Sequence, residues 1–131
     1  MVLVLCTGDN PALARTRQIL LERAGYSVIT AIVEPEIAAA CKKTPYDVAV
    51  LCQQIGRELK EKASVLIRKH CPSAKILELY EASAGRQLAD ADAWLEAPAD
   101  LPTALADKVA ALLPEKKLPQ KKLPQKKKTH A

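Results

Sequence analysis

Residues 2–11 read VLVLCTGDNP and contain the change from strand to helix that decides the fold. The Val and Leu residues occupy consecutive positions, a pattern typical of a parallel strand buried on both faces. The Gly-Asp-Asn-Pro segment that follows predicts a turn, in which Asn10 caps a helix and Pro11 takes its first position. The sequence therefore predicts a strand over residues 1–6, followed at once by a helix that Gly25 ends.

The same alternation continues along the chain and favours an α/β fold. Short apolar strands joined by helices indicate parallel βαβ units with right-handed crossovers, and hence a doubly wound sheet. In such sheets the functional site forms at the carboxyl ends of the strands. Further strands are expected at 27–30, 47–52, 75–80 and 93–96. The expected helices are 34–42, one with the apolar face Leu59, Ala63, Leu66 and Ile67, a weak one at 86–89, and a last one capped by Asp100 with the face Leu101, Leu105, Val109 and Leu112.

Length and composition indicate one globular domain. The chain has 131 residues, of which 49% are hydrophobic and 27% charged, a balance typical of folded proteins. With no Phe and a single Trp, the core must be aliphatic. No apolar run approaches the roughly 18 residues of a membrane span. The first residues lack the basic region of a secretion signal, so we expect a cytoplasmic protein.

The charge is concentrated at the C-terminus. Residues 115–131 contain seven Lys and one acid, whereas the remaining 114 residues hold 13 basic and 14 acidic side chains. The repeats EKKLP, QKKLP and QKKK lack apolar periodicity, which predicts a folded domain over 1–114 and a disordered Lys/Pro-rich tail over 115–131. Such a tail could bind nucleic acid without sequence preference. Its basic residues are Lys116, Lys117, Lys121, Lys122, Lys126, Lys127 and Lys128.

The four cysteines, none closer than eleven residues to the next, match no metal-binding spacing. No metal or other cofactor is therefore expected. Cys6 and Cys52 end two strands that should be neighbours, about 4.8 Å apart, and a disulfide accepts Cα separations of about 4.4–6.8 Å. The two residues are either a redox pair or two small apolar side chains that fill the space between the strand ends.

Four segments together resemble the receiver domain of bacterial response regulators, the phospho-acceptor module of two-component signalling. They are VLVLCTGDNPALARTRQILLERAGYSVITA, YDVAVL, CPSAKILELY and DAWLEAP with the Leu-rich segment after it, and the resemblance covers about residues 2–113. It implies a flavodoxin-like, five-stranded parallel sheet in the order 2-1-3-4-5 with five helices.

The residues on which receiver chemistry depends are largely replaced. The family uses two acids to hold Mg²⁺, an acceptor Asp, a Thr or Ser, and a Lys before a Pro. By the resemblance these positions hold Gly8 and Asp9, Cys52, Tyr80 (or Leu79 if the alignment shifts by one), and Ala97 before Pro98. Mg²⁺ prefers carboxylate and water oxygens, which one Asp beside a thiol supplies poorly. We therefore predict a pseudo-receiver, not an enzyme, that keeps the fold without the aspartyl-phosphate switch.

Two further residues have open interpretations. Glu78 lies in an expected central strand, where a buried carboxylate needs a partner. It either lines the site beside Tyr80 or reaches solvent or a basic neighbour at the end of the strand. Trp94 matches an aromatic position of the family, and it is either a fixed packing residue or, if exposed, an anchor for a partner.

The leading hypothesis is a receiver-like module that acts by protein–protein contacts, either with another protein or as a homodimer, near Trp94. One alternative is a nucleic-acid accessory protein that binds through its tail. The other is a thiol redox sensor that uses Cys6 and Cys52.

Overall fold

A computed structural model describes residues 2–8, 11–31, 34–43, 45–53, 55–97 and 103–114. These residues form a five-stranded parallel sheet in the order β2-β1-β3-β4-β5, which confirms the predicted fold and strand order. The strands are β1 (Leu3–Thr7), β2 (Ser27–Ala31), β3 (Val48–Leu51), β4 (Lys75–Tyr80) and β5 (Ala93–Glu96). They agree with the predicted strands to within two residues at each end.

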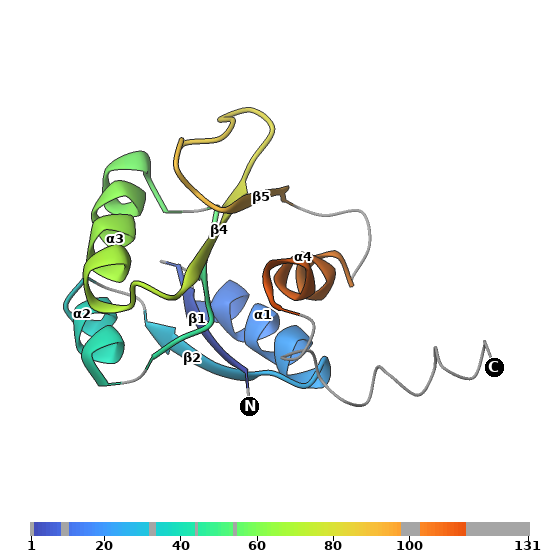
Figure 1. The fold of residues 1–131 in the computed structure, drawn as a ribbon. Helices are drawn as coiled ribbons and strands as arrows, with labels where there is room; N and C mark the ends of the chain where they lie inside the picture. The colour runs from blue at the N-terminus through green and yellow to red at the C-terminus, as the bar shows by residue number, and fades with distance from the viewer. Residues whose placement is uncertain are drawn as a thin grey trace.

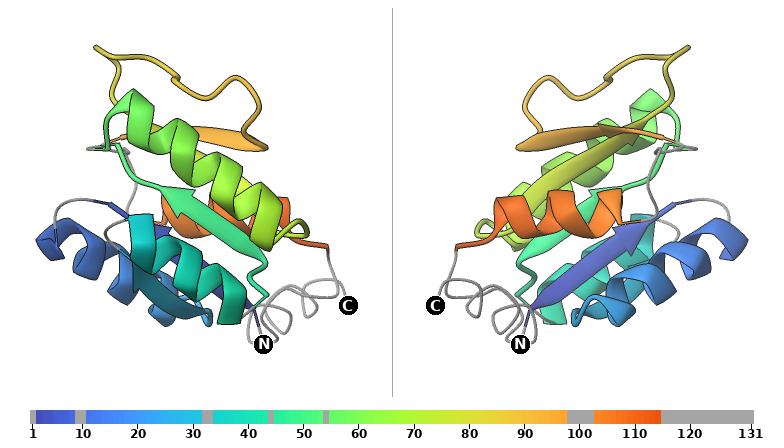
Figure 2. Two further views of the ribbon diagram at one scale, coloured as in Figure 1. Left: turned by 90° about the vertical axis from the view of Figure 1, so that its left-hand side faces the viewer. Right: turned by 90° about the vertical axis from the view of Figure 1, so that its right-hand side faces the viewer.

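Four helices within the described residues cover the two faces of the sheet (Figures 1 and 2). The helices α1 (Pro11–Arg23) and α4 (Ala104–Leu112) pack on one face. The helices α2 (Glu34–Lys43) and α3 (Arg57–His70) pack on the other. None of the helices in this described part of the chain is long and apolar enough to cross a membrane.

Alternate residues of the central strands feed two separate hydrophobic clusters. Cys6, Val50 and Leu77 face α1 and α4, whereas their neighbours Leu5 and Leu51 face α2 and α3. All five are fully buried, which explains why the strands read as continuous apolar runs. The core is aliphatic, as the composition predicts.

The end of α1 illustrates how a local sequence signal fixes an element. Gly25 adopts a left-handed φ of 102°, and its N–H donates to the carbonyl oxygen of Glu22 over 3.0 Å. The N–H of Tyr26 donates to Leu21 O over 3.2 Å, and both side chains lie in the same core cluster. This is a Schellman motif, and the predicted helix stop at Gly25 is confirmed.

The segment between β4 and β5 differs from the prediction. The weak helix expected at 86–89 is wrong, because residues 81–92 contain turns but no helix. The backbone N–H groups of Gln87 and Leu88 donate to the carboxylate of Glu78 over 2.9–3.0 Å, so an acceptor outside the segment takes them. Gly85 also has a positive φ of 74°, which does not suit a helix. The described chain thus has four helices where the resemblance implied five.

Glu78 is the buried end of an ion pair with α3. Its Oε2 lies 2.7 Å from Lys60 Nζ, and the exposed fractions of Glu78 and Lys60 are 0% and 1%. Lys60 Nζ also donates to the carbonyl oxygen of Leu79 over 2.9 Å. The carboxylate therefore has the partner that its position requires, a basic neighbour.

The buried face of α3 is correspondingly shifted from the predicted one. It consists of Lys60, Ala63, Ser64 and Ile67, so Lys60 replaces Leu59, which is only partly covered. A lysine tolerates this position because its ammonium group is paired and hydrogen-bonded.

Several predicted features lie outside the described residues. They are the cap Asn10, the site residues Asp9 and Pro98, the cap Asp100 with Leu101, and the tail 115–131. In the described chain the last helix begins at Ala104, after Thr103, and its predicted face residues Leu105 and Val109 are buried.

The ion pair makes a prediction about stability. Replacing Lys60 by Met leaves the Glu78 carboxylate buried without its cation, and we expect a loss of about 3–5 kcal/mol in the free energy of unfolding. Adding Glu78→Gln should recover part of this loss, because a neutral amide oxygen can still accept the N–H groups of Gln87 and Leu88. Urea denaturation of the single and double variants measures the coupling.

Lys62→Met is the matched control, since Lys62 is exposed on the same helix and should change stability little. Equal losses for the Lys60 and Lys62 variants would contradict the assigned role of the pair.

Candidate functional site

The candidate site lies at the carboxyl ends of β1, β3, β4 and β5. The N–H of Cys52 donates to Thr7 O over 3.0 Å, which places Cys52 beside Gly8. The N–H of Ala97 donates to Tyr80 O over 2.8 Å, which aligns the ends of β4 and β5. Most predicted positions that the structure describes therefore share one edge of the sheet, as parallel strands require.

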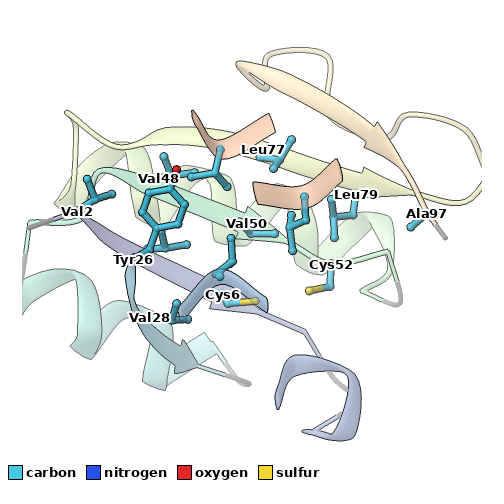
Figure 3. Packing of buried hydrophobic residues seen from close by; sticks show 14 residues of the cluster. Val2, Cys6, Tyr26, Val28, Val48, Val50, Cys52, Leu77, Leu79 and Ala97 are labelled. Atoms are coloured by element: carbon cyan, nitrogen blue, oxygen red, sulfur yellow. The ribbon is translucent and has the colours of Figure 1, made fainter. Parts of the chain in front are cut away.

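Within this edge, Cys52 faces apolar neighbours. Its side chain belongs to the cluster that also contains Cys6, Leu79 and Ala97 (Figure 3). Tyr80 is not part of that cluster, because successive strand residues point to opposite faces. Of the two candidates for the hydroxyl position, Leu79 therefore lies in the same cluster as Cys52, and Tyr80 does not.

Gly8 is in close contact with the thiol. A Cβ atom added at Gly8 would lie 3.1 Å from Cys52 Cβ and 3.3 Å from Cys52 Sγ. Both contacts are tighter than ordinary van der Waals packing, so a side chain at position 8 would require Cys52 to shift by a few tenths of an ångström. The absence of a side chain at Gly8 allows the backbone at this position to lie against the Cys52 side chain.

The sulfur atoms of Cys6 and Cys52 point toward each other (Figure 3). Both residues are buried, with exposed fractions of 0% and 1%, and their side chains are hydrogen-bonded. The bond, burial and the charge of Cys52 all raise the pKa of Cys6, which is therefore the proton donor of the pair. Both cysteines are free thiols in this structure.

A cation from α1 completes the thiol environment. The Arg17 guanidinium lies beside Cys52, and its Nη2 donates to Gln53 Oε1 over 2.6 Å. The hydrogen bond from Cys6, together with the charges of Arg17 and Lys60, lowers the pKa of Cys52 in spite of its burial. Cys52 is thus a thiol whose ionised form is stabilised by its surroundings.

Sequence reasoning missed Arg17, although a signal was present. Arg17 stands three residues after Ala14 and four before Leu21, both of which are buried on the inner face of α1. A basic residue within an apolar helical stripe needs a partner at the sheet, and here the partners are Gln53 and Cys52.

The donor atoms at this edge do not suit Mg²⁺. Within the described residues, no group of three or more His, Cys, Asp or Glu side chains could hold a metal ion. The groups around Cys52 are a thiol, an amide and a guanidinium, whereas Mg²⁺ needs oxygen ligands of mostly negative charge. Asp9, the remaining acid of the predicted pocket, lies outside the described residues.

Two buried polar atoms near this edge have no hydrogen-bond partner within the described residues. They are Thr7 Oγ1 and Arg17 Nη1. Thr7 ends β1, next to Gly8, and it is fully buried.

Trp94 lies on the opposite side of β5 from the thiol cluster, under the 81–92 segment. Its Nε1 donates to Leu88 O over 3.0 Å, and the Arg86 guanidinium lies 4.5 Å from the centre of its ring. The same guanidinium is 5.9 Å from the ring of Tyr80. Trp94 and Tyr80 are half-buried and Arg86 is exposed, so the three form a stacked patch that is partly open to solvent.

Comparison with known proteins supports this fold assignment. No known family profile and no curated protein sequence matches the chain. Among solved structures, the response regulator TrrA of Thermotoga maritima, in complex with Mg²⁺ and BeF, is 25% identical with a TM-score of 0.73. That match covers 86% of this chain and 100% of TrrA.

Two further structures agree. A response regulator of Burkholderia pseudomallei with a phosphorylated aspartic acid is 24% identical over 86% of this chain and 67% of its own, with a TM-score of 0.70. TrrA in complex with the histidine kinase ThkA gives 25% identity over 87% of this chain and 100% of the other, with a TM-score of 0.72. The chain therefore has the fold of the receiver domains that serve two-component phosphorelay signalling.

The assigned environment of Cys52 predicts the effect of removing the cation. In Arg17→Gln the guanidinium charge is lost, so the pKa of Cys52 should rise and less thiolate should form at neutral pH. The pH dependence of iodoacetamide labelling at Cys52, followed by peptide mass spectrometry, measures this shift. Arg15→Gln is the control, because Arg15 is exposed on the same helix. An unchanged labelling profile in Arg17→Gln would contradict the assignment.

Proposed function

We propose that this protein is a receiver-like binding module that works by protein–protein contacts in a bacterial two-component setting, without phosphorylation in the usual Asp/Mg²⁺ manner. The observation that carries the proposal is the thiol of Cys52 at the acceptor position, packed against Gly8 and paired with a cation. No catalytic step is included in it.

The electrostatics of the edge support this proposal. A receiver that takes up phosphate needs a divalent cation to balance the charge of the transferring group. Here Arg17 already places positive charge beside Cys52, and Mg²⁺ would be repelled from the same space. Gly8 supplies no carboxylate to overcome that repulsion, and a side chain at this position would require Cys52 to shift.

The patch of Arg86, Trp94 and Tyr80 is the contact surface that we favour. Protein interfaces are enriched in Trp, Tyr and Arg, and anchors of this kind work best when their own conformation is fixed beforehand. Trp94 is fixed by its bond to Leu88 O and by the stacked guanidinium.

The partner class follows from the comparisons by analogy. TrrA, which shares this fold, has been seen in complex with the histidine kinase ThkA. A kinase or another signalling protein is therefore the partner that we propose, with a second copy of this chain as the alternative. The nucleic-acid hypothesis rests on the Lys residues of the tail 115–131 and stays a prediction.

Phosphorylation chemistry provides the first test. After incubation with acetyl phosphate and Mg²⁺, native mass spectrometry should show no phosphoryl adduct on the protein. Cys52→Asp alone should also stay unlabelled, because a carboxylate at position 52 would still lack the metal-binding acids. An unmodified receiver domain treated in parallel verifies the donor. Stoichiometric, Mg²⁺-dependent labelling that disappears in Cys52→Ala would overturn the proposal.

The contact surface has a separate test. A photo-crosslinking amino acid placed at Arg86 in cells of the source organism should yield one dominant protein adduct, and the same group at Lys62 should not. The expected adduct weakens when Trp94→Ala is added to the Arg86 variant. Identical products from positions 86 and 62 would show that the patch is not the interface.

A further inference from the structure

The four cysteines, far apart in sequence, form two pairs in space. Cys6 and Cys52 meet on the α1/α4 face of the sheet, as described above. Cys41 and Cys71 meet on the α2/α3 face, where Cys71 Sγ donates to Cys41 O over 3.5 Å and the two side chains are hydrogen-bonded. All four residues are buried.

The two pairs have opposite electrostatic surroundings. Arg17 and Lys60 both stabilise negative charge on Cys52, and Cys6 donates a hydrogen bond to it. In the other pair, burial and the charge of Cys71 raise the pKa of Cys41 to about 12. Burial therefore disfavours ionisation of Cys41, whereas the surroundings of Cys52 favour it.

We propose that Cys52 and Cys6 form a peroxide-responsive thiol pair, in which oxidation joins the carboxyl ends of β1 and β3 at the edge where related domains are phosphorylated. Oxidation of this pair would give the site a signal that does not depend on phosphorylation. The inference rests on the sulfur contact and the Arg17 cation and is independent of the proposed partner surface.

The chemistry proceeds in two balanced steps with hydrogen peroxide as the oxidant. The Cys52 thiolate attacks one peroxide oxygen, the O–O bond breaks, and the leaving hydroxide takes up a proton to become water, which leaves a sulfenic acid on Cys52. The Cys6 sulfur, losing its proton, then attacks the Cys52 sulfur. The S–O bond breaks, the hydroxyl group leaves with that proton as water, and a disulfide forms.

The strand register makes this bond a conformational event. Cys6 pairs with Val50, so Cys52 lies two residues further along instead of opposite Cys6, as the sequence alone suggested. With strands about 4.8 Å apart and a rise of about 3.3 Å per residue, the Cα atoms are roughly 8 Å apart. A disulfide needs less than about 7 Å, so its formation must draw Cys52 toward Cys6.

The position of Cys52 allows this movement and connects it to the end of β1. It follows the last residue of β3, and its N–H is bonded to Thr7 O directly before Gly8. Drawing Cys52 inward therefore pulls on Thr7 and Gly8 at the end of β1. Because both sulfurs are covered, a small neutral oxidant such as hydrogen peroxide suits the site better than a bulky disulfide such as oxidised glutathione.

The test uses the full-length protein, reduced and then titrated with hydrogen peroxide. Free thiols are blocked at intervals, and peptide mass spectrometry identifies the linked residues. We expect the Cys6–Cys52 disulfide to form about tenfold faster than any product at Cys41 or Cys71. Oxidised glutathione at the same concentration should act more slowly. Simultaneous oxidation of all four cysteines, or earlier linkage of Cys41 to Cys71, would overturn the proposal.

Two variants separate the steps. In Cys6→Ser the sulfenic acid on Cys52 cannot be resolved, so dimedone should trap it there. In Arg17→Gln the disulfide should form severalfold more slowly, whereas Arg15→Gln should behave as the unaltered protein. If Arg17→Gln does not fold, the dimedone experiment on Cys6→Ser still tests the proposal. The absence of an adduct at Cys52 in folded Cys6→Ser protein would refute the proposed first step.

Discussion

The buried ion pair between Lys60 and Glu78 determines how the second half of the sheet is built. Taking both charges out of water costs several kcal/mol each, and the cost is offset only if every lone pair and proton finds a partner. Here Lys60 Nζ has Glu78 and Leu79 O, while the carboxylate has Lys60 and two backbone N–H groups of the 81–92 segment. One side chain of β4 thus connects the sheet, a helix and a loop.

This arrangement explains why the segment before β5 is ordered without being a helix. With Gln87 and Leu88 bound to the carboxylate, Leu88 O is free to accept the indole N–H of Trp94. At the far end of the segment, Asp92 Oδ2 accepts the N–H of Ile76 over 2.7 Å and pairs with Arg68 at 3.2 Å. The loop is therefore held at both ends, and its middle carries Arg86 over the aromatic rings. Where the resemblance implied a further helix, this segment is a loop bound at both ends.

At the carboxyl ends of the strands, the fixed charge beside Cys52 is positive, whereas Mg²⁺ binding requires negatively charged ligands. A metal-dependent receiver gathers carboxylates there, whereas this chain brings the Arg17 guanidinium to a thiol. An arginine cannot lose its charge in a protein, so the site permanently favours an anion. Cys52 lies beside this cation, and its pKa is lowered in spite of its burial.

The alternation of apolar strands and helices and the helix stop at Gly25 can be read from the sequence, because each depends on neighbours a few residues away. The assignment of Cys52 to the acceptor position rests on a family pattern and stays a prediction. The sequence also indicated that Glu78 needs a partner. It did not identify Lys60 as that partner. An amphipathic pattern does not show whether a lysine next to the apolar face is buried in an ion pair or exposed to solvent. Nor did it pair Arg17 with Cys52 or Cys41 with Cys71, or offset Cys6 from Cys52 by two residues. Those relations depend on strand register and on helices packing across the sheet, and only the tertiary structure sets which distant side chains leave water together.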